Sequence, residues 1–147
     1  MTADLLFDCR HQLAEGPVWH ENALWWVNIN AGELHRLDPA TGNHRHRAVG
    51  GLLGCAVPTD HGRWLLARNG GLDFLDFESG VLEPICAPEG DRLRHRFNDG
   101  KCDPEGRFFT GTINLDGKPE AAFYRMGADL RPVRLLEGVT VSNGLAW

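Results

Sequence analysis

The chain has 147 residues, of which 42% are hydrophobic and five are tryptophan, so a packed globular domain is expected and global disorder is excluded. The formal net charge is −5 at pH 7, and without a basic stripe a nucleic-acid partner is not expected. No stretch approaches the roughly 18 apolar residues of a membrane span, and the first residues lack the pattern of a secretion signal. We therefore expect no membrane partner and a cytoplasmic location.

Taken in chain order, the predicted elements form a repeat. Each unit opens on a glycine and a strand-like run, turns tightly, and continues into a hydrophobic strand rich in Trp, Phe and Leu. The units open at Gly16, Gly54, Gly100 and Gly144, at intervals of roughly 40 to 50 residues, the period of propeller blades. The second strands are predicted at 24–27, 64–67 and 108–111, the third at 33–37, 72–77 and 123–126, and the fourth at 44–49, 81–85 and 133–136.

This repeat predicts an all-β protein, a β-propeller of four-stranded blades, because no useful 3.6-residue periodicity indicates helices. Three blades and the start of a fourth do not close a ring and would expose long sheet edges. We therefore expect 1–147 to be the N-terminal half of a propeller. The predicted blades are 16–53, 54–99 and 100–143, with a fourth starting at 144–147, and the predicted inter-blade core contains Trp19, Trp25, Trp26, Trp64, Phe108 and Phe109.

The residue just before each opening glycine is a candidate for the central channel. These residues are Glu15, Leu53, Asp99 and Asn143, so three of the four carry an oxygen donor. Because the first strands of propeller blades face the channel, we interpret Glu15, Asn143 and the Asn98–Asp99 pair as lining one polar pocket. The alternative is that they are independent turn residues, since Asn and Asp are common in turns.

The polar groups around this channel favour a hard cation. Residues 96–101, Arg-Phe-Asn-Asp-Gly-Lys, place two cations, an amide and a carboxylate around one aromatic residue. Carboxylate and amide oxygens suit calcium, magnesium or manganese, and the four cysteines form no C-x-x-C pair. Two ligands do not complete a site, so zinc and iron remain open. The seven histidines are assigned to surface or supporting positions.

Three segments, 15–19, 96–107 and 142–147, resemble in this order the regucalcin, gluconolactonase and luciferin-regenerating-enzyme family. The resemblance covers the whole chain but only about the N-terminal half of a usual family member. It implies a six-bladed propeller that binds one divalent cation, with calcium the first choice, and that hydrolyses sugar lactones to aldonic acids. It also implies Glu15 and Asn143 as metal ligands, and Arg96, Asn98 and, as the nearest acidic candidate, Asp116 as substrate-binding residues.

The resemblance also implies that the general base, an Asp of the fifth blade, lies beyond Trp147, so no catalytic residue is assigned within the chain. We expect metal-dependent hydrolysis of a sugar lactone, in which a polarised carbonyl is attacked by activated water. The alternative is a non-catalytic half-propeller that binds a cation or assembles with itself, or with a missing C-terminal half, through its open sheet edges. No serine lies in a G-x-S-x-G elbow, which argues against a serine hydrolase.

Overall fold

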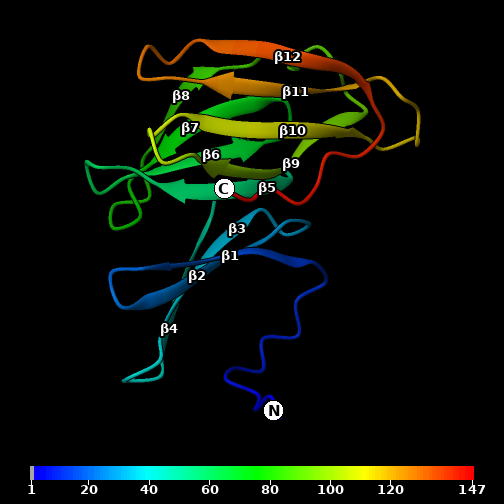
Figure 1. Cartoon of the computed structure of the whole chain (residues 1–147). Helices are drawn as coiled ribbons and strands as arrows, with labels where there is room; N and C mark the ends of the chain where they lie inside the picture. Colours follow the sequence, from blue (N-terminus) through cyan, green and yellow to red (C-terminus); the bar gives the residue numbers. More distant parts are fainter. Residues whose placement is uncertain (1) are drawn as a thin grey trace.

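The computed structural model describes residues 2–147, and this part of the chain consists of strands and connections without a helix. No helix long and apolar enough to cross a membrane occurs in these residues. Figure 1 shows three sheets in succession along the chain, from blue and cyan through green to orange. The strands are β1 (Ala14–His20), β2 (Ala23–Asn28), β3 (Glu33–Asp38), β4 (Asn43–Ala48), β5 (Leu53–Pro58), β6 (Trp64–Arg68), β7 (Gly71–Leu75), β8 (Leu82–Cys86), β9 (His95–Cys102), β10 (Phe108–Asn114), β11 (Ala121–Met126) and β12 (Pro132–Val139).

Each sheet contains four antiparallel strands in chain order: β1 to β4 in blade one, β5 to β8 in blade two and β9 to β12 in blade three. Tight turns such as those at Glu21 and Asn22, both with positive φ, join neighbouring strands. The prediction of four-stranded blades in an all-β chain is thus confirmed.

The inner strands begin at Ala14, Leu53 and His95, earlier than the glycines that mark the repeat. In blade three the earlier residues pair with β10, since His95 lies opposite Asn114 and Phe97 opposite Thr112. Each inner strand then changes register at a β-bulge, within Glu15–Val18 in β1, Leu53–Cys55 in β5, and opposite Thr110–Thr112 in β9. The polar segment before Gly100 is therefore part of a bulged strand, and such bulges re-aim side chains.

The segment 144–147 forms no strand in the structure. The chain just before it runs beside β10, where Val141 makes one isolated antiparallel bridge with Ile113, and Ser142 N donates to Thr112 O at 3.3 Å. The start of a fourth blade at this place stays a prediction.

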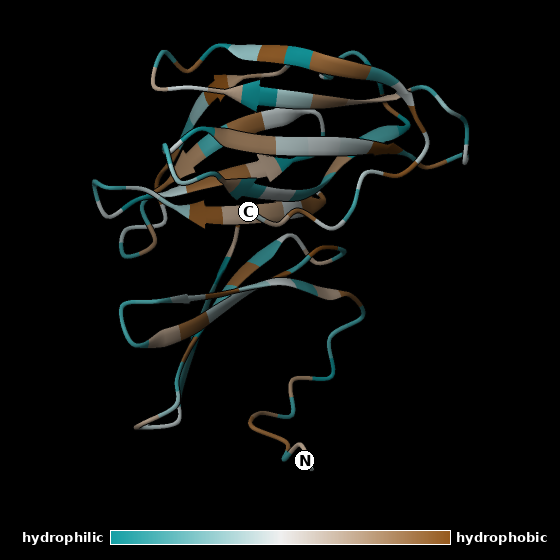
Figure 2. Cartoon of the chain, viewed as in Figure 1, coloured by the Kyte–Doolittle hydropathy of each residue, from teal (hydrophilic) through white to brown (hydrophobic). Residues whose placement is uncertain are grey.

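The hydrophobic core lies between the blades. Figure 2 shows hydrophobic segments along the strands, whereas most turns are hydrophilic. Trp25 of blade one contacts Trp64 of blade two, with ring centroids 4.4 Å apart. Phe97 and Phe108 of blade three lie in a second buried cluster with Val57 and Leu65 of blade two. The prediction of an inter-blade aromatic core is wrong for Trp19, which is 62% exposed, because alternate residues of β1 face away from the interface. Trp26 and Phe109 also lie outside the two clusters.

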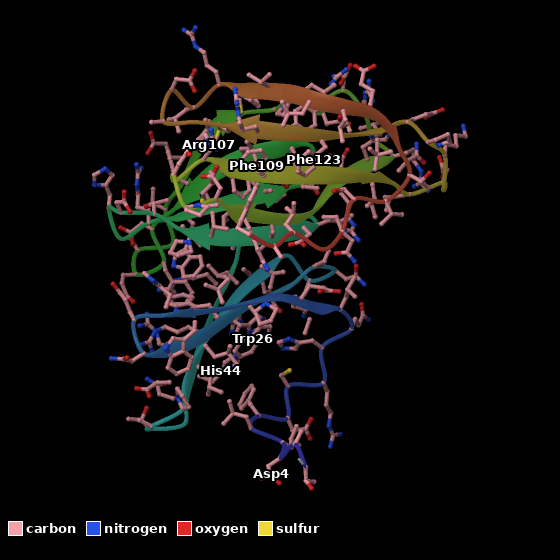
Figure 3. All side chains as sticks on the ribbon, viewed as in Figure 1. Asp4, Trp26, His44, Arg107, Phe109 and Phe123 are labelled. Atoms are coloured by element: carbon pink, nitrogen blue, oxygen red, sulfur yellow. The ribbon has the colours of Figure 1, made fainter. Side chains whose placement is uncertain are left out.

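Blade one carries a histidine cluster on its other face that the sequence did not reveal. His35 is only 3% exposed; its Nδ1 lies 3.0 Å from His44 Nε2, and its Nε2 lies 3.1 Å from Glu33 Oε2. Trp26 stacks on this pair and donates a hydrogen bond to His11 Nδ1 at 3.1 Å. Figure 3 labels Trp26 and His44 on this blade. The cluster comprises His11, Trp26, Asn28, Glu33, His35, His44 and His46.

Burial lowers the pKa of His35 to about 4, and the nearby His11 and His44 act in the same direction, while Glu33 opposes them. In the unfolded chain the same ring takes up a proton near its ordinary pKa of 6.5. The stability contributed by neutral His35 is therefore present above pH 6.5 and is lost as the pH falls toward 4.

Between pH 7 and pH 4.5 the free energy of unfolding should fall in both the native chain and a His35→Gln variant. We expect the fall to be larger in the native chain, by on the order of 2 kcal/mol. Urea unfolding followed by tryptophan fluorescence at the two pH values measures this difference. His61→Gln, in the exposed β5–β6 turn, is the matched control and should behave like the native chain. Equal losses in the native chain and the His35→Gln variant would contradict the assignment.

Candidate metal and substrate site

The inner-strand ends of the three blades and the segment after blade three surround one cavity of about 290 Å³. Glu15 lines it from β1, Asn98 and Asp99 from β9, and Asn143 from the C-terminal segment. The structure therefore brings together the residues that precede the repeat glycines, apart from Leu53, which is fully buried. Strand β5 contributes Gly54, Cys55 and Ala56 to the wall.

Glu15 owes its position to the bulge in β1. It pairs with Val27 of β2, and the following Gly16 has a φ of +57°, a left-handed conformation that favours glycine. Glu15 is exposed and makes no hydrogen bond or ion pair with another side chain within residues 2–147. Its carboxylate is therefore available to a ligand in the cavity.

Asn98 is held in a fixed orientation by two hydrogen bonds. Its Oδ1 accepts from Arg96 Nη1 at 2.8 Å, and its Nδ2 donates to the Ser142 carbonyl at 2.7 Å. Because arginine can only donate, the oxygen of the amide must face Arg96. One lone pair of Oδ1 remains for a ligand.

Arg96 contacts Asn98 but is not among the residues that line the cavity. It is 7% exposed, and Nη1 also donates to the Phe97 carbonyl at 2.8 Å. Burial lowers the pKa of the Arg96 guanidinium, and the charge of Glu15 opposes this effect. Within the described chain its Nε and Nη2 make no hydrogen bond, so they can serve a substrate.

Asp99 has a role that sequence reasoning missed. Its Oδ2 accepts hydrogen bonds from the backbone N–H groups of Gly144 at 2.9 Å and Leu145 at 3.0 Å, and Oδ1 accepts from Gly100 at 2.8 Å. These bonds attach the segment carrying Asn143 to β9. Asp99 thus positions Asn143, whose own Oδ1 accepts from Gly144 N at 3.1 Å.

Asp116 does not lie in this pocket. It lines a separate cavity of about 540 Å³, which shares no residue with the first. Its Oδ1 accepts hydrogen bonds from Arg94 Nη2 at 2.7 Å and Nε at 3.1 Å, and this contact holds the pKa of Asp116 below its ordinary value. The assignment of Asp116 as a substrate-binding residue stays a prediction, because Asp116 does not share a cavity with Glu15, Asn98 and Asn143.

The donor set of the first cavity fits a hard divalent cation. It offers the free carboxylate of Glu15 and amide oxygens of Asn98 and Asn143. Burial raises the pKa of the nearby Cys55 thiol to about 12, so this cysteine stays neutral and provides no thiolate for a softer metal. Within residues 2–147 no three His, Cys, Asp or Glu side chains form a metal-binding group, so further ligands are needed for a complete coordination shell.

Antiparallel four-stranded blades whose inner strands meet at a polar cavity define a β-propeller protein. Residues 13–147 match the family profile described as SMP-30/Gluconolactonase/LRE-like region, and the chain belongs to this family. The resemblance inferred from the three sequence segments is thereby confirmed.

The relatives that the chain resembles are consistent with this family. The chain is 36% identical over 138 residues to 6-deoxy-6-sulfogluconolactonase of Pseudomonas putida, covering 92% of this chain and 47% of that protein. The solved structure of a luciferin-regenerating enzyme superposes with a TM-score of 0.86 at 26% identity, over 93% of this chain and 49% of the other. The calcium-binding protein regucalcin of Agrobacterium tumefaciens superposes with a TM-score of 0.81 at 27% identity, over 87% and 44%. The chain spans about half the length of the curated relatives it matches.

Proposed function

We propose that this chain forms the N-terminal half of a metal-dependent sugar lactonase, which converts an aldonolactone to an aldonic acid. Glu15 and Asn143 would hold one divalent cation, and Arg96 and Asn98 would hold the sugar. The observation that carries the proposal is the shared cavity of Glu15, Asn98 and Asn143, in which the Glu15 carboxylate has no hydrogen-bond or ion-pair partner among residues 2–147. The names of the relatives, which include a sulfogluconolactonase, support the reaction class.

Calcium is the first choice for the cation, because all donors are oxygen atoms and one structural relative is described as calcium-binding. Magnesium, manganese, zinc and iron are the alternatives. When bound, such a cation supplies a Lewis acid that polarises the lactone carbonyl and stabilises the negative charge that develops on its oxygen.

The residues of this chain would orient the substrate. The Nε and Nη2 groups of Arg96, which make no hydrogen bond within residues 2–147, would donate to sugar hydroxyls, and the burial of this side chain strengthens such bonds. Asn98 is already fixed by Arg96 and Ser142, so little orientational freedom is lost when the sugar binds. The Asp99 carboxylate accepts hydrogen bonds from three backbone N–H groups, so we assign it no role in proton transfer. The proposed general base is the fifth-blade Asp beyond Trp147.

A non-catalytic half-propeller that associates with itself is the second candidate. It is favoured by apolar side chains left exposed on blade three and the C-terminal segment. Phe109 and Phe123 of this blade are labelled in Figure 3, and Trp147 packs against Phe109 with ring centroids 4.9 Å apart. The exposed apolar residues of β12 and the C-terminal segment are Val133, Leu135, Leu136, Val141 and Trp147.

Acid release from gluconolactone, recorded with calcium and with a chelator and corrected for spontaneous hydrolysis, tests the proposal. Because the general base is placed beyond Trp147, the assay uses the chain together with the half that carries this Asp. We expect calcium-dependent hydrolysis that falls at least about tenfold in Arg96→Gln, because one charged hydrogen-bonding group is lost. Arg36→Gln, on β3 of blade one and outside the cavity lining, is the matched control. A self-associated chain, detected by analytical ultracentrifugation, with no turnover would favour the second candidate.

A further inference from the structure

A network of buried polar side chains joins blade three to the connection that precedes it, and the proposed site does not explain this network. Its centre is Glu89, in the connection between β8 and β9, whose side chain is completely shielded from solvent. One carboxylate oxygen lies 2.6 Å from His95 Nδ1, and the other accepts a hydrogen bond from the Tyr124 hydroxyl. Tyr124 in turn accepts from Arg134 Nε at 3.2 Å. A buried carboxylate needs such partners, because its desolvation is costly.

The hydrogen-bond directions beyond His95 follow from groups that can only donate. The backbone N–H of Asp116 donates to Asn114 Oδ1 at 2.7 Å, which fixes the orientation of the amide. Asn114 Nδ2 therefore faces His95 Nε2, 3.1 Å away, and donates to it. His95 must then be neutral, with its proton on Nδ1 directed at Glu89.

This network joins the two strand ends that carry candidate substrate residues. His95 and Asn114 lie opposite each other at the ends of β9 and β10. His95 directly precedes Arg96, and Asn114 holds the backbone of Asp116 two residues further along. Both His95 and Asn114 are buried in the wall of the cavity that contains Asp116.

We propose that Glu89 is a positioning residue: through His95 and Asn114, its carboxylate sets the backbone at Arg96 and at Asp116. Because Arg96 holds Asn98 of the cavity, the orientation of a bound sugar lactone depends on Glu89 as well. This proposal rests on the proposed function. A well-packed apolar residue would stabilise the same place at least as well, so stability alone does not account for a buried charge there. A chain of hydrogen bonds with every direction fixed supplies what packing does not, namely a single ring orientation for His95.

Nitrogen-15 NMR of the histidine side chains tests the network directly. In the native chain we expect His95 to be neutral with the proton on Nδ1. Glu89→Met removes the acceptor and should abolish this signature and shift the backbone amides of Arg96 and Asp116. Glu89→Gln keeps an acceptor oxygen and should restore both. Tyr124→Phe, which leaves the Glu89–His95 contact in place, should preserve the His95 signature.

Gluconate, titrated in the presence of calcium, reports on substrate orientation. We expect its Kd to rise about tenfold in Glu89→Met and less than about twofold in Glu89→Gln. If Glu89→Met does not fold, Asn114→Leu can be used instead, because it removes the hydrogen bonds from Asn114 to His95 and from Asp116 N to Asn114. It should shift the NMR signal of the Asp116 amide and leave the Glu89–His95 hydrogen bond in place.

A His95 that is doubly protonated or carries its proton on Nε2 would overturn the proposal, as would unmoved Arg96 and Asp116 amides in Glu89→Met. Unchanged gluconate affinity despite moved amides would refute the positioning role. A native chain that does not bind gluconate would instead count against the proposed function, and the network would still be judged by the NMR signals.

Discussion

Replacement of Glu15 by Gln should weaken calcium binding to this chain at least about tenfold, a loss of about 1.4 kcal/mol. Glu15 is the one carboxylate in the cavity without a hydrogen bond or ion pair within residues 2–147, whereas the carboxylate of Asp99 is occupied by backbone N–H groups. The substitution keeps the volume and one oxygen of the side chain and removes only the charge. Since a divalent cation near the surface interacts strongly with a full negative charge, the charge should dominate the affinity.

Isothermal titration with calcium measures this loss. Glu21→Gln is the matched control, because it removes the same charge from the turn at the other end of β1, where the side chain is 74% exposed. Asn143→Ala should also weaken binding, but less, because it removes a neutral ligand. Equal affinities of the native chain and Glu15→Gln would contradict the assignment of Glu15.

Gly54→Ala should destabilise the chain by about 2 to 3 kcal/mol, because β5 and β9 approach each other too closely for a side chain at this point. An added Cβ would lie 2.2 Å from the Phe97 carbonyl oxygen and 2.9 Å from Asn98 N. Both are backbone atoms of the bulged strand, so they cannot move away without displacing it. The change should therefore also disturb Asn98 and weaken calcium binding.

Gly127→Ala is the control for Gly54→Ala. Its nearest neighbour would be Asp129 Oδ1 at 3.6 Å, an ordinary contact, so we expect a change within about 0.5 kcal/mol. Urea denaturation followed by tryptophan fluorescence compares the two variants. A Gly54→Ala variant as stable as Gly127→Ala would show that the blades can separate there at little cost.

The sequence predicted the blades and the shared cavity because both depend on local signals. Turn residues and hydrophobic strands recur in each unit, and a polar residue before Gly16, Gly100 and Gly144 marks an inner-strand position. The starts of the inner strands were predicted too late, because the bulges interrupt the pattern while pairing continues on both sides.

Other features depend on contacts between residues far apart in the chain. From the sequence, Asp99 is interpreted as lining the polar pocket or as a turn residue, yet it binds backbone groups of Gly144 and Leu145 in the next segment. Two partners of His35, namely His44 on β4 and His11 on the N-terminal segment, carry no local signal either. Asp116 was assigned by resemblance alone, and its contact with Arg94 joins two loops that no sequence spacing connects.

Paramagnetic broadening by manganese tests most directly whether one cation lies among Glu15, Asn98 and Asn143. At substoichiometric Mn²⁺, the NMR signals of these three residues should broaden together, and excess calcium should restore them. The signals of Asn43, the first residue of β4 and outside this cavity, should stay sharp, and Glu15→Gln should suppress the broadening. Broadening confined to other residues, or broadening of the three that persists in Glu15→Gln, would contradict a shared cation site.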